Sequence, residues 1–334
     1  MADIKTYTDA DVAGKRVLVR VDFNVPLADG VVTDDTRIRA ALPTITYLME
    51  QGARVILCSH LGRPDGTGFQ AEFSLAPVAE HLAKVLGRPV AFATDTIGDS
   101  AKATVESLED GNVCLLENLR FDKREKKNDP EFAQALADLA ELYVNDAFGA
   151  AHRAHASTFG VASCLPAYAG ALMTREVTTL TSMLDTPKRP FVAILGGSKV
   201  SDKIKVIDAL IEKADTLIIG GGMCFTFLKA QGFETGTSLM EEDWIERSAE
   251  TLKKAGEKGV KILLPTDVVC ADAFANDANK VTCGVDAIPS DMMGLDIGPE
   301  TTKAYAEAIA GAASVFWNGP MGVFEMPSYE AGTK

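Results

Sequence analysis

Residues 191–203 combine the residue types that suit the binding and transfer of a phosphate group. Five apolar residues, Phe191–Leu195, are followed by two glycines and then by Lys199 and Lys203. Glycines let an anion approach the backbone, and two ammonium groups could meet the negative charge shared between a donor and an acceptor phosphate. The Walker A spacing GxxxxGK[ST] is absent, so the same stretch also fits an ordinary strand-to-helix connection.

The spacing of apolar residues predicts the elements that would hold these lysines. Phe191–Leu195 is typical of a short buried strand, and Ser198 is the expected N-cap of a helix whose apolar residues run from Val200 to Ile211. Lys199 and Lys203 would then lie four positions apart on one face of the first helical turn. Beside them would stand the free N–H groups at the positive end of the helix dipole, which is the outline of an anion site.

Polar and basic side chains follow the expected strands of the first half of the chain. They are Asp22, Phe23 and Asn24; His60, Leu61, Gly62 and Arg63; Arg120; and His152 with Arg153, while Arg37 precedes the first long helix. Because the carboxyl ends of parallel strands gather at one edge of a sheet, we expect the four arginines and both histidines to converge on one basic site. Arginine forks suit carboxylate and phosphate oxygens, so the expected ligand is small and multiply anionic. Any one of these arginines could instead be a solvated loop charge.

Glycine-rich turns follow the expected strands of the second half. Gly220–Gly222 come after one strand, and Asn318, Gly319 and Gly322 come after another. With few arginines nearby, these turns fit a flat, partly apolar ligand that carries phosphates, such as a nucleotide, better than a second small acid. The glycines alone would also fit tight βα turns.

The order of elements predicts the fold class. Expected strands are 16–21, 54–58, 89–93, 113–117, 142–145, 191–195, 216–219, 260–264 and 314–317, and expected helices include 38–51, 75–86, 130–139 and 301–310. This alternation predicts an α/β protein with two Rossmann-like parallel-sheet domains and helices on both faces. A helical run at 171–184 ends in DTPKRP, a stop before a fresh strand, so we expect an N-terminal domain at 1–170, an inter-domain hinge at 171–188 and a C-terminal domain at 189–334.

Composition narrows the class of protein. The chain has 334 residues, 47% of them hydrophobic, and a formal net charge of −14, which argues against general nucleic-acid binding. No apolar run has the length of a membrane span, and the N-terminus lacks the apolar core of a signal peptide. Six cysteines are scattered without metal-binding spacing, so we expect reduced thiols in a cytoplasmic protein.

Ten motifs together resemble phosphoglycerate kinase, in that family's order and over nearly the whole chain. They are RVDFNVP (20–26), DDTRIRA (34–40), SHLGRP (59–64), ENLRF (117–121), NDAFGAAHRAHAS (145–157), GGSKVSDK (196–203), IGGGM (219–223), LPTD (264–267), DIGP (296–299) and WNGPMGVFE (317–325). The resemblance implies a glycolytic enzyme that transfers a phosphoryl group reversibly between 1,3-bisphosphoglycerate with MgADP and 3-phosphoglycerate with MgATP.

The resemblance also implies roles for individual residues. The 3-phosphoglycerate site would comprise Asp22, Phe23, Asn24, Arg37, His60, Leu61, Gly62, Arg63, Arg120 and Arg153, and the nucleotide site Gly196, Gly197, Lys203, Gly221, Gly222, Asn318, Pro320, Gly322, Val323 and Glu325. Arg37, Lys199 and Lys203 would be catalytic, and Glu325 would hold the ribose hydroxyls. No protein residue would be a dedicated metal ligand, since Mg²⁺ would come with ATP or ADP. No general base is needed because the acceptor carboxylate is ionised at neutral pH.

The two sites would face each other across a cleft between the domains, and closure about the hinge helix would expel water and align the reacting oxygens. A monomer is expected, because such an enzyme must open and close freely. Family members continue beyond the WNGPMGVFE region with a GGGD[ST] loop whose acidic residue helps to hold the Mg-nucleotide, whereas this chain ends at Lys334. We therefore expect a C-terminally truncated chain in which binding of the acid is retained better than catalysis.

Two other functions are considered. One is a kinase-derived fragment that binds 3-phosphoglycerate or a protein partner without turnover, which an activity assay would distinguish. The other is a dinucleotide-dependent dehydrogenase, which predicts a GxGxxG turn after the first strand. That strand is followed instead by DFNVP, so this alternative is discounted.

Overall fold

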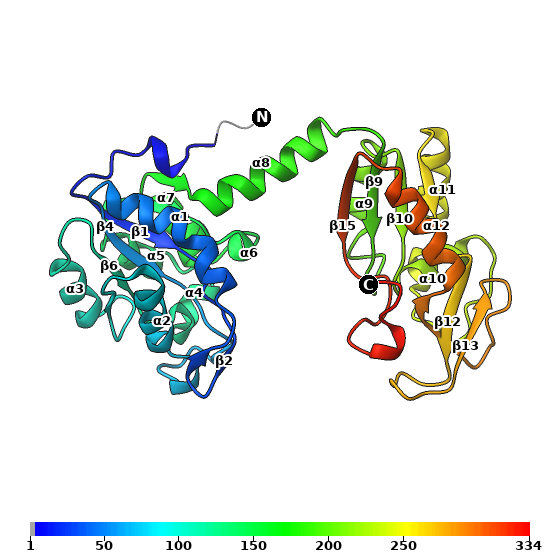
Figure 1. Ribbon diagram of the computed structural model, residues 1–334, viewed down its shortest axis with the longest axis horizontal. Helices are drawn as coiled ribbons and strands as arrows, with labels where there is room; N and C mark the ends of the chain where they lie inside the picture. Colours follow the sequence, from blue (N-terminus) through cyan, green and yellow to red (C-terminus); the bar gives the residue numbers. More distant parts are fainter. Residues whose placement is uncertain (1–3) are drawn as a thin grey trace. The chain divides into compact units, whose positions relative to one another are not determined.

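The chain folds into two units that divide between Thr181 and Ser182, and each is described by itself. The computed structural model describes residues 4–334 (Figure 1). The division falls within helix α8 (Ala171–Asp185), the helix expected to be the hinge. The narrower domain limits at 170 and 188 stay predictions.

The first unit is built on a six-stranded parallel sheet. Its order is β5-β6-β4-β1-β7-β8, with β5 (Ala91–Phe92), β6 (Val113–Leu115), β4 (Arg54–Cys58), β1 (Arg16–Arg20), β7 (Leu142–Asn145) and β8 (Ala167–Ala169). Strand β1 has β4 on one side and β7 on the other. The chain therefore adds β4, β5 and β6 on one side of β1 and then β7 and β8 on the other, a topological reversal at β1. In doubly wound sheets such a reversal is where ligand sites form, beyond the carboxyl ends of the strands.

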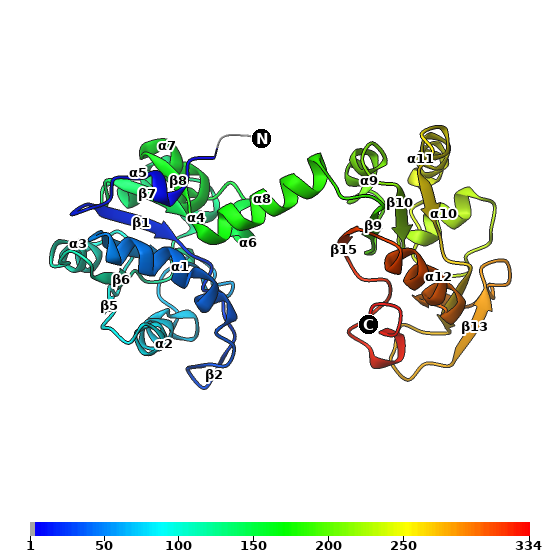
Figure 2. The ribbon, with the colours of Figure 1, turned by 45° about the horizontal axis from the view of Figure 1, so that its top comes forward.

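Alternation along the central strands buries both faces of this sheet. Val17 and Val19 of β1 belong to the same core as helices α1 (Thr36–Glu50) and α2 (Ala76–Leu86). Leu18 points to the opposite core, which contains α3 (Asp99–Glu106), α5 (Pro130–Ala137) and α7 (Val161–Cys164). Figure 2 shows α1 and α2 below β1, with α5 and α7 above it. The run of apolar residues that predicted buried strands thus reflects helices packed on both sides.

Local sequence signals explain where several elements begin and end. Asp129 caps α5 by accepting the backbone N–H of Phe132 at 3.0 Å, with Pro130 in the first turn. The hairpin of β2 (Leu27–Ala28) and β3 (Val31–Val32) turns at Asp29-Gly30, both with positive φ, which is a favoured two-residue hairpin turn. The unit also contains two short helices, α4 (Lys123–Lys126) and α6 (Phe148–Ala151).

The start of α8 is held by a buried threonine and a buried aspartate. The Thr44 hydroxyl accepts the N–H of Ala171 at 2.8 Å and donates to Asp146 Oδ2 at 2.7 Å. The other oxygen of Asp146 accepts the N–H of Met173 at 3.1 Å. These bonds satisfy N–H groups that the first turn of a helix leaves without partners, so α8 is anchored firmly to the first unit at this end.

The second unit contains a four-stranded parallel sheet. Its order is β11-β10-β9-β15, with β11 (Lys261–Leu263), β10 (Thr216–Ile219), β9 (Phe191–Leu195) and β15 (Ser314–Asn318). Helices α9 (Ile204–Ile211), α10 (Cys224–Ala230) and α11 (Ile245–Glu257) pack on one face of this sheet, and α12 (Pro299–Ala310) packs on the other (Figure 2). The predicted fold class, parallel sheets with helices on both faces, is confirmed for both units.

Two features of the second unit differ from the sequence-based expectations. A three-stranded antiparallel sheet, β13-β12-β14, is formed by Lys280–Gly284, Asp267–Ala271 and Met293–Ile297. These strands were not predicted, because β13 is largely exposed and β14 contains a glycine, so neither shows a clear apolar pattern. The second difference is the start of α9 at Ile204 rather than after Ser198. Among residues 4–334, no helix combines the length and apolar composition that crossing a bilayer requires.

Candidate active-site residues in the two units

A basic cavity of about 370 Å³ lies at the carboxyl edge of the first unit's sheet. It is lined by Asn24, His60, Gly62, Arg63, Arg120, Lys126, Arg153 and His155. These residues lie beyond the ends of β1, β4, β6 and β7, which are the strands around the topological reversal at β1. The structure therefore brings most of the predicted acid-binding side chains together, on loops positioned by a rigid sheet.

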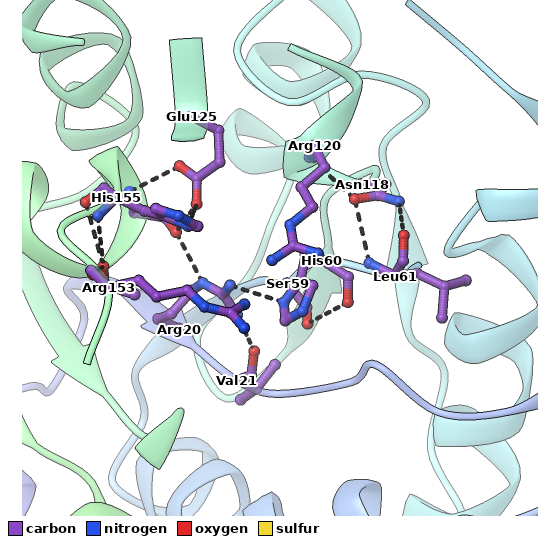
Figure 3. Close-up of polar contacts among 12 residues, drawn as sticks. Arg20, Val21, Ser59, His60, Leu61, Asn118, Arg120, Glu125, Arg153 and His155 are labelled. Carbon is purple, nitrogen blue, oxygen red and sulfur yellow. Dashed lines mark hydrogen bonds and ion pairs between the residues drawn. The ribbon is translucent and has the colours of Figure 1, made fainter. Parts of the chain in front are cut away.

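Side-chain hydrogen bonds tie these loops to one another. The Asn24 Oδ1 atom accepts the N–H of Gly62 at 2.8 Å, which joins the loops after β1 and β4. Asn118 donates to the carbonyl oxygen of Leu61 at 2.8 Å and accepts the N–H of Arg120 at 3.0 Å (Figure 3). It also donates to the carbonyl oxygen of Phe73 at 2.9 Å. Asn118 is fully buried and was not predicted to have a role, although it stands in the ENLRF motif. It holds the loop after β4 against the loop after β6.

Arg120 has a buried donor that the described protein does not use. The side chain is 8% exposed, and its Nη1 donates to the carbonyl of Gly62 at 2.7 Å. Its Nε atom is buried and has no hydrogen-bond partner among the described residues. Burial, with Arg153 and Arg20 nearby, lowers the pKa of Arg120. A buried donor without a partner costs free energy, so the site is suited to a ligand that supplies an acceptor.

The histidines of this site are uncharged near neutral pH. Burial, followed by the positive charges of Arg20, Arg120 and Arg153, lowers the pKa of His60 to about 2. Burial also lowers the pKa of His155. The positive charge of the cavity therefore comes from its arginines and from Lys126, while the imidazoles supply neutral hydrogen-bonding groups.

Other predicted members of the acid site lie elsewhere or differ in detail. Arg37 does not line the cavity; its Nη1 donates to Asp22 Oδ2 at 2.9 Å on an exposed surface. The side chains of Phe23 and Leu61 are buried in the hydrophobic core, so only their backbone atoms remain for a ligand. The predicted convergence of His152 was wrong: this residue is exposed, and His155 takes its place. The short helix α6 (Phe148–Ala151) changes the direction of the chain after β7. The positions of the residues that follow it therefore could not be predicted from the end of β7 alone.

A second cavity, of about 330 Å³, lies at the carboxyl ends of the second unit's strands. Seven of the predicted nucleotide-site residues line it: Gly197, Gly221, Gly222, Pro320, Gly322, Val323 and Glu325. Gly196, Lys203 and Asn318 are outside the lining. Lys203 Nζ instead donates to Asn318 Oδ1, which links the loop after β9 to the end of β15. The predicted glycine-rich turns therefore meet around one cavity.

Large apolar side chains form a further part of the lining, called the apolar wall here, which was not predicted. They include Phe225 at the start of α10, Leu239, Phe274, and Met293 and Leu295 of β14. Leu239 and Phe274 are at least half exposed, so they offer apolar surface that a flat ligand could cover. The apolar residues after the GGGM turn and before DIGP are the sequence signal that could have indicated this wall. A cavity with one apolar wall and one backbone wall suits a planar, partly apolar ligand.

Gly221 is required by the packing of the backbone wall. Its φ of +67° is one that other residues rarely adopt, and a Cβ at this position would lie 2.6 Å from the backbone N of Gly197. The loops after β9 and β10 thus touch backbone to backbone. This close approach accounts for glycine structurally, and it also leaves the surface of the wall open to a ligand.

The loop that carries the two lysines is not a helical turn. Residues 198–203 form turns before α9, so Lys199 and Lys203 do not share a face of the helix as predicted. Glu241 holds this loop by accepting the N–H of Ser201 at 2.9 Å and its hydroxyl at 2.7 Å. Burial would raise the pKa of Glu241, but the bonds from Ser201 and the charge of Lys199 bring it below its ordinary value. The side chain of Lys199 is exposed.

One buried carboxyl group lines the second cavity. Burial raises the pKa of Asp296 to about 6, although its oxygens accept the backbone N–H groups of Ile297 and Gly332, both at 2.9 Å. Among residues 4–334, no group of three or more His, Cys, Asp or Glu side chains could hold a metal ion. Mg²⁺ bound with a nucleotide usually takes one or two carboxylates besides phosphates and water, and the carboxylates in the lining of this cavity are Asp296 and Glu325.

The comparisons with known proteins agree on one family. Residues 7–334 match the family model of phosphoglycerate kinase. The phosphoglycerate kinase of Synechococcus elongatus is 58% identical over 333 residues, which is 99% of this chain and 83% of the relative. That of Moorella thermoacetica is 59% identical over 329 residues, covering 98% and 84%. The solved structure of phosphoglycerate kinase from Coxiella burnetii is similar with a TM-score of 0.85 and 44% identity, covering 99% of this chain and 83% of that one.

Proposed function

The chain belongs to the phosphoglycerate kinase family, and we propose a division of its reaction between the two cavities. Its function is glycolytic: reversible phosphoryl transfer between 1,3-bisphosphoglycerate with ADP and 3-phosphoglycerate with ATP. The basic cavity of the first unit binds 3-phosphoglycerate, and the glycine-walled cavity of the second unit binds the adenine nucleotide. Mg²⁺ belongs to the nucleotide substrate and is bound by its phosphates.

The observation that carries the acid site is the free Nε of Arg120. This buried donor belongs to a cavity that is lined by three arginines and two neutral histidines. Such a cavity suits 3-phosphoglycerate because that ligand is small and multiply anionic. In this proposal Arg63, Arg120 and Arg153 bind carboxylate and phosphate oxygens in the fork geometry that guanidinium groups favour. Asn24 and His60 supply neutral donors, and the backbone of 22–24 and 60–62 completes the site. Arg37, now paired with Asp22, is the cation that moves onto the reacting group.

The nucleotide site rests on the contrast between its two walls. The adenine ring would lie against Phe225, Leu239 and Leu295, with the glycine backbone of the loops after β9 and β10 on its other side. Glu325, which lines the same cavity, would accept hydrogen bonds from the ribose hydroxyls. Lys203 would release its hydrogen bond to Asn318 and bind the nucleotide phosphates instead. Lys199 would stabilise the phosphoryl group during transfer.

Catalysis in this proposal is positioning and charge stabilisation. The acceptor carboxylate is ionised at neutral pH, so no residue has to remove a proton. In-line transfer requires the acid held by one unit to meet the nucleotide held by the other, so we propose a closing movement in which α8 acts as the hinge. A monomer in the cytoplasm fits such an enzyme, and the six cysteines fit a reducing compartment because none of them is in a disulfide in the described chain.

The decisive experiment is 3-phosphoglycerate-dependent ATP consumption by the 334-residue chain with Mg²⁺. We expect turnover that a Lys199→Ala variant loses by at least about a hundredfold, the usual cost of removing one transition-state charge contact. Calorimetric titration of 3-phosphoglycerate in the absence of nucleotide is the companion measurement. Binding without turnover would favour the alternative of a non-catalytic acid-binding fragment, and neither binding nor turnover would refute both proposals.

A further inference from the structure

Arg20 lies behind the basic cavity and does not line it. It is the last residue of β1 and is 1% exposed. Its Nη1 donates to the carbonyl of Val21, its Nε donates to Ser157 Oγ at 2.8 Å, and its Nη2 lies 3.0 Å from Nδ1 of His60 (Figure 3). Each of its three nitrogens therefore contacts another protein atom. Arg20 is held inside the protein as a fixed charge rather than offered to a ligand.

Glu125 and Ser157 fix the orientation of this guanidinium. Glu125 is fully buried, and its two carboxylate oxygens accept the backbone N–H of Ser157 at 2.9 Å and its hydroxyl at 2.6 Å. The Ser157 hydroxyl therefore donates to Glu125 and uses its lone pair for Arg20. Hydrogen bonds thus run in one direction, from Arg20 through Ser157 to Glu125. The negative charge of Glu125 also compensates for a buried arginine, which would otherwise be costly.

This arrangement decides which nitrogen of His60 carries the proton. A guanidinium group only donates hydrogen bonds, so the Nδ1 atom that faces Arg20 has to accept one. The ring is then neutral, and its single N–H is on Nε2. A proton on Nδ1 would place two donors face to face at 3.0 Å.

We infer that Arg20 is a positioning residue: held by Ser157 and Glu125, it keeps His60 as a neutral Nε2–H donor directed at the ligand in the basic cavity. His60 then recognises an oxygen of that ligand by a hydrogen bond and never as a cation. This inference rests on the proposed function for the identity of the ligand, 3-phosphoglycerate, but not for the state of the ring.

The charges around His60 support the same state. They are Arg20 from β1, Arg120 after β6, and Arg153 and His155 after β7, with the carboxylate of Glu125 on α4 bonded to Ser157. Burial and the neighbouring arginines make a second positive charge unfavourable, in line with the lowered pKa of His60. The ring should therefore keep one proton, on one nitrogen, throughout pH 5–8, where an ordinary histidine titrates.

The first test uses the unaltered, ligand-free chain labelled with ¹⁵N-histidine. Long-range ¹H–¹⁵N correlation spectra distinguish a protonated from an unprotonated ring nitrogen, and the signals missing from a His60→Gln variant identify His60 among the four histidines. We expect a protonated Nε2 and an unprotonated Nδ1, unchanged from pH 5 to 8. A proton on Nδ1, or a titration within this range, would overturn the inference. No substrate is needed, so this outcome does not depend on the proposed function.

The second test removes the buried charges together, because Arg20→Met alone would leave Glu125 uncompensated. In an Arg20→Met/Glu125→Gln variant we expect mixed ring protonation at His60, and a KM for 3-phosphoglycerate raised about tenfold, the value of one hydrogen bond to a charged ligand, with kcat changed less. Arg16→Met, at the half-buried opposite end of β1, is the matched control and should alter neither the ring protonation of His60 nor the KM.

A double variant in which the His60 ring keeps its single Nε2–H form, while KM rises and kcat falls by similar factors, would show that Arg20 is only structural. Should the double variant fail to fold, the spectra of the unaltered chain still decide the inference. Absence of calorimetric 3-phosphoglycerate binding by the unaltered chain, with the expected ring state, would refute the proposed ligand and leave the role of Arg20 intact.

Discussion

The two cavities are lined by different parts of the protein. The basic cavity of the first unit presents polar and charged side chains, of which His60 and Arg120 are buried, on loops joined by hydrogen bonds such as that from the Gly62 N–H to Asn24. The cavity of the second unit presents backbone and apolar surface, with Gly197 and Gly221 packed against each other and Phe225 among the apolar side chains of the lining. A highly charged ligand is recognised by fixed donors, whereas a planar ligand is recognised by shape. Substitutions that remove a charge should therefore weaken ligand binding in the first cavity, and substitutions that add an atom should weaken it in the second.

Arg120→Met gives the largest expected effect. It removes the unpaired Nε and the bond from Nη1 to Gly62, while methionine keeps an unbranched side chain that replaces the apolar stem of the arginine. Hydrogen bonds to charged groups are worth about 1.5–3 kcal/mol each, so kcat/KM for 3-phosphoglycerate should fall about a hundredfold to a thousandfold. Steady-state kinetics with each substrate varied would measure it. An equal loss of nucleotide affinity in the ligand-free chain would contradict the division between the cavities.

Gly221→Ala tests the backbone wall of the second cavity. The added Cβ meets the backbone of Gly197 at 2.6 Å, and the φ of +67° strains any residue other than glycine. We expect a loss of about 2–4 kcal/mol in the free energy of unfolding of the second unit, from strain and overpacking together, and weaker ATP binding.

Gly259→Ala is the matched control for this variant. Its φ of +72° is nearly the same, but no atom lies within 4 Å of the added Cβ. It should cost about 1 kcal/mol and leave ATP binding unchanged. Urea unfolding can follow both variants through Trp244 and Trp317, the two tryptophans of the chain, since both are in the second unit. Equal losses in the two variants would show that backbone strain, rather than the contact with Gly197, explains glycine at 221.

The parts of the molecule that sequence could predict are those fixed by local patterns. Strands β4, β7, β9 and β10 begin and end where their apolar runs do, since a strand covered by helices on both sides needs apolar residues throughout. Residues after such strands meet at one edge, which is why Arg63, Arg120 and Arg153 could be placed together.

What could not be predicted depends on contacts between distant residues. Asn118 reads as an ordinary turn residue until Leu61 and Phe73 are beside it. Ser198 looks like an N-cap, but Glu241 binds Ser201 and holds residues 198–203 in turns, so α9 begins later. Leu295 belongs to an antiparallel strand whose partner lies more than twenty residues away, a pairing that no local pattern specifies.

Asp296 predicts a pH dependence confined to the second unit. Its folded pKa, raised by burial to about 6 from an ordinary 3.8, means that its contribution to stability is fully present below pH 3.8 and is lost as the pH rises through about 6. The difference corresponds to at most about 3 kcal/mol between pH 3.5 and 7, and solvent screening at the cavity surface reduces it. Asp296→Asn should remove this part of the pH dependence of the tryptophan-detected urea midpoint. A variant with the same pH profile as the unaltered chain would show that Asp296 ionises as an ordinary carboxyl group.

Glu241→Gln gives the smallest expected effect, because it alters the support of a loop and not a contact with substrate. The carboxylate accepts two hydrogen bonds from Ser201, and a glutamine keeps one good acceptor but loses the second and the negative charge. The loop should then hold Lys199 less firmly. Since Lys199 is proposed to act on the phosphoryl group in transit, kcat should fall by about threefold to tenfold, with KM for 3-phosphoglycerate unchanged. A Glu242→Gln variant, the neighbouring carboxylate, is the control. If Glu241→Gln raised KM for the acid instead, the loop of the second unit would take part in acid binding, and the contrast between the two cavities would need revision.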